Sequence, residues 1–213
     1  MKKGLFLTIE GPEGSGKSTQ IGFITEFLQS RGYETVLTRE PGGTQIGEKI
    51  RDIILDKENR EMDSMTETML YAASRAQHVA QIIKPALEAG KAVICDRFVD
   101  SSIAYQGYGR KLGDSVTYIN EYAIMGCVPD ITFLMKIPPD RSMDRITSGS
   151  RDRLELEKME FHRRVYEGYM ELEKLYPARI TGIDAGRSIE EIKEEIHKHL
   201  ERLLEKYESS ESS

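Results

Sequence analysis

Short apolar runs alternate with longer amphipathic segments along this 213-residue chain. Alternation of strands and helices is typical of an α/β domain whose parallel sheet is covered by helices on both faces. We therefore predict one such domain at 1–207 and a disordered tail at 208–213. The apolar runs predict five strands, at Gly4–Glu10, Glu34–Thr38, Ala92–Cys95, Ile131–Ile137 and Arg179–Asp184. The amphipathic segments predict helices, at 18–29, 44–55, 64–89, 114–125, 154–175 and 188–207.

The longest predicted helix, at 64–89, has an apolar face. Its spacing places five side chains roughly on one side, namely Leu70, Ala73, Ala80, Ile83 and Leu87. Such a face packs either in the core of the domain or against a second copy of the chain.

Composition narrows the class of protein. No stretch approaches the roughly 20 apolar residues that a membrane helix requires, so we expect no membrane association. Two cysteines, Cys95 and Cys127, are too few for a disulfide framework and indicate a reducing, cytoplasmic setting. A net charge of −6 argues against a general nucleic-acid binder. The four histidines form no metal-ligand set, and we expect them to be structural or at the surface.

The first strand runs directly into a phosphate-binding motif. The string GPEGSGKS at 11–18 fits GxxxxGK[ST] and stands between a strand and a helix, as this motif requires. Glycines let the backbone amides wrap around phosphate oxygens, Lys17 adds a positive charge, and the Ser18 hydroxyl suits Mg²⁺. The motif indicates a nucleoside triphosphate, without saying which one. The predicted binding residues for this nucleotide are Gly11, Pro12, Glu13, Gly14, Ser15, Gly16, Lys17, Ser18 and Thr19.

Two further segments favour phosphoryl transfer. Asp96 and Arg97 follow the central apolar strand, where the aspartate suits Mg²⁺ and the arginine suits a second phosphate. The polar segment at 140–153, here called the lid, predicts a mobile flap that brings cations to the transferring phosphoryl group. Its candidate catalytic arginines are Arg145, Arg151 and Arg153.

Five strings together resemble the thymidylate kinase family: GPEGSGKST at 11–19, TREPGGT at 38–44, YAASRAQH at 71–78, DRFVDSSIAYQG at 96–107 and SRDRLELE at 150–157. The resemblance implies a P-loop kinase fold with a five-stranded parallel sheet, an arginine-bearing lid, and a homodimer. It also implies transfer of the γ-phosphate of ATP to dTMP, with Mg²⁺.

The same resemblance implies a binding site for dTMP. Arg39 and Arg97 would hold the acceptor phosphate, with Glu13 near the sugar and phosphate. Tyr71 would stack on thymine, and Arg75 would donate to a base carbonyl. These two residues are spaced i, i+4 and so share one helix face. The remaining predicted dTMP contacts come from one segment, with Ser102 at the base edge, Tyr105 against the sugar carbon that lacks a hydroxyl, and Gln106 as a further contact.

The P-loop string contains no arginine, so a lid arginine must supply the catalytic charge. Alternatives are a kinase for another nucleoside monophosphate or a deoxynucleoside, or a nucleotide-binding scaffold without activity. Arg39 and Arg97 favour a monophosphate acceptor over an uncharged nucleoside. A scaffold is disfavoured because the P-loop lysine and the lid arginines are all present.

Overall fold

The computed structural model describes residues 4–145 and 152–211. Its centre is a sheet of five parallel strands in the order β2-β3-β1-β4-β5. This sheet confirms the predicted fold class, and each strand lies within one residue of its predicted bounds. The strands are β1 (Leu5–Glu10), β2 (Thr35–Arg39), β3 (Ala92–Asp96), β4 (Ile131–Lys136) and β5 (Ile180–Asp184).

Helices fill the connections between the strands. Two π-helical segments, η1 (Val79–Ile83) and η2 (Ile103–Gly109), continue helices that precede them. The helices are α1 (Lys17–Ser30), α2 (Gln45–Leu55), α3 (Ser64–His78), α4 (Lys84–Glu88), α5 (Val99–Ser102), α6 (Ser115–Ala123), α7 (Pro139–Arg145), α8 (Met159–Leu175) and α9 (Ile189–Glu211).

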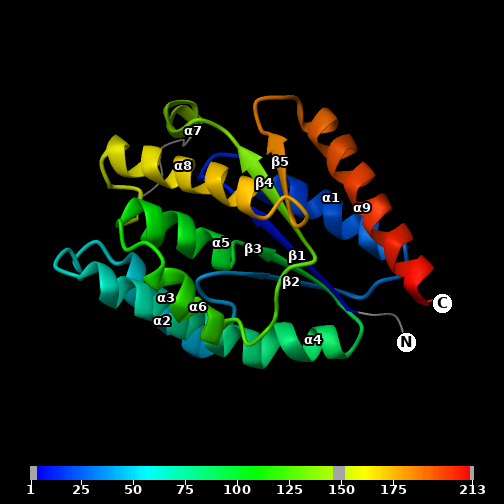
Figure 1. The fold of residues 1–213 in the computed structure, drawn as a ribbon, viewed down its shortest axis with the longest axis horizontal. Coiled ribbons are helices and arrows are strands. Elements are labelled where there is room, and N and C mark those ends of the chain that lie inside the picture. Colours follow the sequence, from blue (N-terminus) through cyan, green and yellow to red (C-terminus); the bar gives the residue numbers. More distant parts are fainter. Residues whose placement is uncertain (1–3, 146–151, 212–213) are drawn as a thin grey trace.

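The sheet is covered on both faces, as alternation along each strand requires (Figure 1). Leu5, Leu7 and Ile9 of β1 belong to the apolar cluster that includes residues of α1 and α9. Phe6, between them, points to the other face and joins a cluster with η1 and α4. Among the described residues, no helix is long and apolar enough to cross a membrane.

The predicted apolar face of the long helix is wrong. Ala73 and Ala80 are exposed, whereas Ile83 is buried. The helix instead buries a largely polar face, because side chains from neighbouring segments satisfy its hydrogen bonds, and the π-helical turn η1 then changes which residues point inward. The buried residues of α3 are Glu67, Thr68, Tyr71, Ala72, Ser74, Arg75 and His78.

Three predicted boundaries also change. The segment expected to be a flap from residue 140 begins as α7, and α8 starts at Met159 instead of Leu154. The Asp152 carboxylate accepts from the amides of Leu154 and Glu155, which forms a turn before α8. The disordered tail expected from residue 208 is wrong for 208–211, since α9 continues to Glu211 through residues without glycine or proline.

Candidate active site

The loop between β1 and α1 has a backbone that only glycines adopt readily. Gly11, Gly14 and Gly16 have φ of +131°, +72° and +85°. A Cβ on Gly11 would lie 2.6 Å from the carbonyl oxygen of Met135 on β4. The first turn of α1 holds no acidic residue, and no side chain of the described residues caps its N-terminus. The helix therefore presents free amides and the positive end of its dipole to an anion.

Lys17 lies over this loop. Its Nζ donates to the carbonyls of Pro12 (3.0 Å) and Gly11 (3.3 Å). Burial, together with the charge of Arg97, lowers the pKa of Lys17 to about 8. A bound anion would offset both effects, so the loop holds a cation that is poorly compensated until phosphate arrives.

Asp96 and Arg97 lie at the carboxyl end of β3, beside Ile9 of β1. Arg97 has φ of +66°, and its guanidinium donates to Glu13 at 3.1 Å across the pocket mouth. The guanidinium also lies over the Tyr105 ring, 5.4 Å from the ring centroid. The turn after β3 thus aims Arg97 toward the P-loop.

Asp96 provides an oxygen that fits a hard cation. Its Oδ1 is buried and has no hydrogen-bond partner in the part of the chain that the structure describes. No group of three His, Cys, Asp or Glu residues that could hold a metal occurs within 4–145 and 152–211. One carboxylate and the Ser18 hydroxyl fit Mg²⁺, which proteins hold through few side chains, waters and substrate phosphates.

Glu10, the last residue of β1, fixes the turn that carries Arg97. Its buried carboxylate accepts from the amide of Phe98 (2.7 Å), the hydroxyl of Ser101 (2.6 Å) and the hydroxyl of Tyr169 (3.0 Å). Burial and the charge of Asp100 raise the pKa of Glu10 to about 7. The prediction from sequence missed this residue, although a carboxylate ending a buried strand requires partners.

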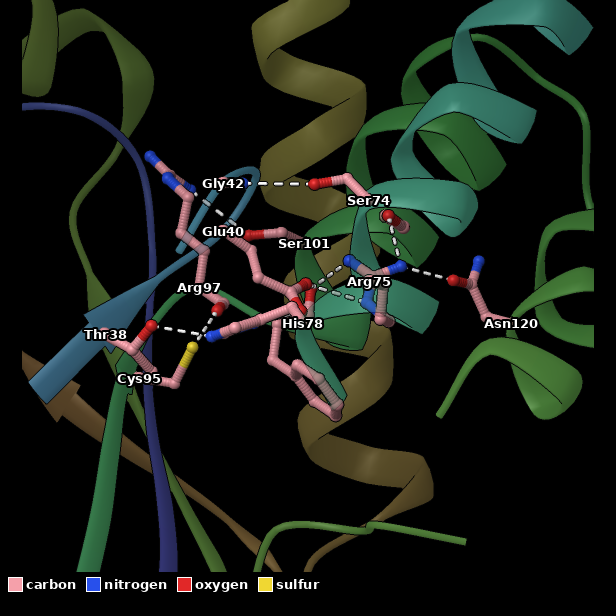
Figure 2. Close-up of polar contacts among 12 residues, drawn as sticks. Thr38, Glu40, Gly42, Ser74, Arg75, His78, Cys95, Arg97, Ser101 and Asn120 are labelled. Atoms are coloured by element: carbon pink, nitrogen blue, oxygen red, sulfur yellow. Dashed lines mark hydrogen bonds and ion pairs between the residues drawn. The ribbon is translucent and has the colours of Figure 1, made fainter. Parts of the chain in front are cut away.

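Arg75 of α3 is almost completely buried, with 1% of the residue exposed. Figure 2 shows its guanidinium at the centre of a polar network. Its Nε donates to Glu40 (2.8 Å), its Nη1 to Ser102 (3.0 Å) and Asn120, and its Nη2 to the Phe98 carbonyl (3.1 Å). The network joins α3 to the loop after β2, to α5 and to α6. Arg75 is therefore held rigidly in the pocket wall.

Glu40 also contacts His78, which lies one turn after Arg75 on α3. His78 Nδ1 lies 3.0 Å from Glu40, and its Nε2 lies 2.6 Å from the Thr38 hydroxyl (Figure 2). Ser74 accepts from the amide of Gly42 at 3.1 Å. These contacts confirm the structural reading of His78 and fasten the loop after β2 to α3.

Cys95 is a buried strand residue. It is fully buried on β3, and its thiol donates to the Arg97 carbonyl at 3.0 Å. Burial raises the pKa of this thiol well above its usual range, so Cys95 is a core residue and not a nucleophile.

A pocket lies between the P-loop, the turn after β3 and the buried face of α3. The structure brings seven of the eight predicted dTMP residues to its wall, namely Glu13, Tyr71, Arg75, Arg97, Ser102, Tyr105 and Gln106. Residues from the two ends of the lid and next to it also line the pocket, namely Pro139, Ser142, Met143, Asp152, Leu154 and Glu155.

Arg39 is the predicted dTMP residue that does not line this pocket. Its guanidinium pairs with Glu48 at 2.8 Å, and the Arg39 side chain is 46% exposed. Arg51 of α2 lines the pocket instead, and both arginines donate to the Pro41 carbonyl. Arg51 falls on the inward face of α2 with buried Gly47 and Ile54, a spacing that would have revealed it.

The described lid arginines are held outside the pocket. Arg145 donates to the Ala185 carbonyl at 2.9 Å. Arg153 donates to the Ile54 carbonyl at 2.8 Å and to Glu67. Neither lines the pocket, and Arg151 lies outside the described residues. A catalytic role for any of the three stays a prediction.

A parallel sheet with β1 at its centre, a P-loop after that strand and an Asp-Arg pair at the end of its neighbour define the class of P-loop kinases. Comparison of this sequence with known protein families identifies its family. A family model described as thymidylate kinase matches residues 9–196, so the chain belongs to the thymidylate kinase family, whose members are nucleoside monophosphate kinases.

Individual relatives agree with this family. The thymidylate kinase of Exiguobacterium sp. strain AT1b is 51% identical over 94% of this chain and 96% of its own length. That of Clostridium novyi is 49% identical over 92% of this chain and 98% of its own. A crystal structure of thymidylate kinase from Ehrlichia chaffeensis, 36% identical, superposes with a TM-score of 0.76 and covers 93% of this chain and 99% of that one.

Proposed function

We propose that this chain transfers the γ-phosphate of ATP to dTMP, giving dTDP and ADP. The observation that carries the proposal is the pocket that joins the P-loop side of the site to the buried face of α3. That pocket has guanidinium groups at one end and the Tyr71 ring with polar amide and hydroxyl groups at the other. A pyrimidine monophosphate has the matching order of charged and aromatic parts.

The P-loop would hold the donor. Its amides and the N-terminus of α1 cradle the ATP phosphates, and Lys17 turns from the loop carbonyls to the β- and γ-phosphates. Ser18 and Asp96 would hold Mg²⁺, which would neutralise the charge on the donor phosphates.

Arg97 and Arg51 would hold the acceptor phosphate, with Glu13 keeping Arg97 in place until substrate arrives. A phosphate oxygen of dTMP then attacks the γ-phosphorus in line, and the bond to the oxygen that bridges to the β-phosphorus breaks, which releases ADP. A lid arginine would add charge at the transferring group. Because catalysis consists of positioning and charge neutralisation, no covalent enzyme intermediate is required.

At the other end, Tyr71 would stack on thymine, and Tyr105 would lie against the sugar carbon that lacks a hydroxyl. Ser102 and Gln106 would meet the polar edge of the base. Arg75 already donates from all three of its nitrogens to protein groups, so its main contribution is a rigid wall.

The decisive experiment follows the phosphate. Incubation with dTMP, Mg²⁺ and ATP labelled at the γ-phosphorus should place the label in dTDP, separated by ion-exchange chromatography. Label that appears only as inorganic phosphate, or that stays in ATP, would contradict the proposed transfer.

The homodimer implied by the family resemblance is part of this proposal. Exposed apolar side chains on α2, α3 and α6 support it, since monomers rarely leave such groups uncovered together. They are Ile46, Ile53, Met69, Tyr118 and Tyr122. The single kinase domain, with its lid at 140–153, and the cytoplasmic location also stay predictions.

A further inference from the structure

Glu67 lies on the buried face of α3, one helical turn before Tyr71. None of its side chain is exposed, and the site as proposed so far gives it no role. Its Oε1 accepts from the amide nitrogen of Gln106 at 2.8 Å. Both oxygens accept from Arg110, and Oε2 also accepts from Arg153. A single carboxylate thus joins α3 to η2 and to Arg153 at the end of the lid.

The two arginines keep Glu67 ionised. Burial alone would raise the pKa of this carboxyl, but hydrogen bonds and charge from Arg110, with further hydrogen bonds from Gln106 and Arg153, lower it below its ordinary value. An ionised carboxylate accepts hydrogen bonds and donates none. Gln106 must therefore turn its NH₂ group toward Glu67.

This contact leaves the carbonyl oxygen of Gln106 as the group that can accept a hydrogen bond from a ligand. Gln106 lines the pocket, and its Oε1 is buried without a hydrogen-bond partner in the described part of the chain. A buried carbonyl oxygen without a partner costs free energy, which a ligand recovers only by supplying a donor. A ligand that presents an acceptor at this point leaves two acceptors facing each other.

We propose that Glu67 is a positioning residue that fixes the Gln106 amide as an acceptor, and so selects pyrimidines that carry a hydrogen on N3. This inference rests on the proposed function, in which the base end of the pocket receives a pyrimidine. Thymine and uracil carry a hydrogen on N3, whereas the same nitrogen of cytosine is an acceptor. Glu67 thereby acts on base selection through Gln106, without touching the base.

The test compares two acceptors that differ only at this edge, dTMP and 5-methyl-dCMP. In Glu67→Gln the amide at position 67 donates as well as accepts, so Gln106 is free to turn over. We expect the ratio of kcat/KM for dTMP to that for 5-methyl-dCMP to fall about 10- to 100-fold. Glu157→Gln is the matched control, because Glu157 also pairs with Arg110 but has no contact with Gln106. Its ratio should equal that of the wild type.

A double variant separates orientation from a general loss of structure. Glu67→Gln with Gln106→Glu exchanges the two groups and keeps the charge near Arg110 and Arg153. An acceptor is again the only group left at position 106, so the dTMP preference should return. This variant decides the question if Glu67→Gln alone does not fold.

The outcomes separate this inference from the proposed function. A wild type that does not phosphorylate dTMP would remove the function, and with it the premise. A wild type that prefers dTMP, together with a Glu67→Gln variant that keeps the full ratio while kcat falls for both acceptors, would show that Glu67 only anchors Arg153. A double variant that folds without regaining the preference would overturn the inference as well.

Discussion

One continuous loop, residues 11–18, borders the phosphate end of the pocket, whereas its base end is assembled from side chains far apart in the sequence. The loop needs glycines at fixed positions and uses its own backbone amides. At the base end, Tyr71, Arg75 and Gln106 come from α3 and η2. The partners of Arg75 belong to four other segments and are Glu40, Ser102, Asn120 and the Phe98 carbonyl.

This difference has an energetic consequence. The phosphate end is close to a surface loop, so changing its charged groups should alter chemistry and leave stability nearly unchanged. The base end is a buried polar network, where losing one member leaves the others without partners. Variants at the two ends should therefore separate activity from stability.

Lys17→Met should have the largest effect on activity. It removes the cation that neutralises the β- and γ-phosphates, and we expect kcat to fall about 10³-fold. Unfolding by urea should stay close to the wild type, because in the described part of the chain the Lys17 Nζ donates to two loop carbonyls and to no carboxylate. Lys174→Met, at an exposed ion pair, is the control and should keep full activity. Near-normal turnover of Lys17→Met would refute the P-loop assignment.

Arg97→Met should lower kcat/KM for dTMP about 10²-fold, since a charge-assisted contact with the acceptor phosphate is lost. The affinity for ATP, measured by calorimetry without dTMP, should change far less. Arg163→Met, in a pair that is exposed on both sides, should change neither quantity. Equal loss of ATP and dTMP binding would show that Arg97 serves both nucleotides.

Arg75→Ala tests the base end through stability. It would leave the carboxylate of Glu40 buried with only His78 beside it, and breaking a buried pair costs about 3–5 kcal/mol. The measurement is the free energy of unfolding from urea titration. Arg163→Ala, at the surface, should cost at most about 1 kcal/mol. If the two variants lose similar stability, the buried network does not stabilise the base end of the pocket.

The smallest expected effect is a change in the free energy of unfolding with pH. Burial and the charge of Asp100 raise the pKa of Glu10 from an ordinary value of 4.5 to about 7, and the charge of Arg97 opposes this rise. Tyr169 and Lys17 also face the carboxyl. Between those two values the folded state holds a proton that the unfolded state has lost. The free energy of unfolding should therefore fall as pH rises from about 4.5 to about 7, by up to about 1.4 kcal/mol per unit, and then level off.

Glu10→Gln should remove that slope and leave the remaining pH dependence in place. Urea titrations of both proteins at pH 5, 6, 7 and 8 give the comparison. An identical slope in the two proteins would show that Glu10 is ionised throughout this range.

The sequence predicted most of the fold because strands and helices leave local patterns. It also placed the P-loop and the Asp96-Arg97 pair, whose spacing is fixed by one turn of backbone. The buried face of α3 could not be predicted, because the partners that allow Glu67 to be buried come from other segments and leave no local pattern. Arg39 was predicted and Arg51 was missed for a related reason, since only folding shows which guanidinium reaches the pocket.

The central claim is that the α3 side of the pocket selects a thymine monophosphate for a P-loop phosphoryl transfer. The most direct measurement is ADP release with MgATP across dTMP, dUMP, UMP, CMP, AMP, GMP and thymidine. We predict that dTMP gives the highest kcat/KM and that thymidine, which lacks the phosphate, gives none. A higher value for another monophosphate, or no ADP release with any acceptor, would contradict the account.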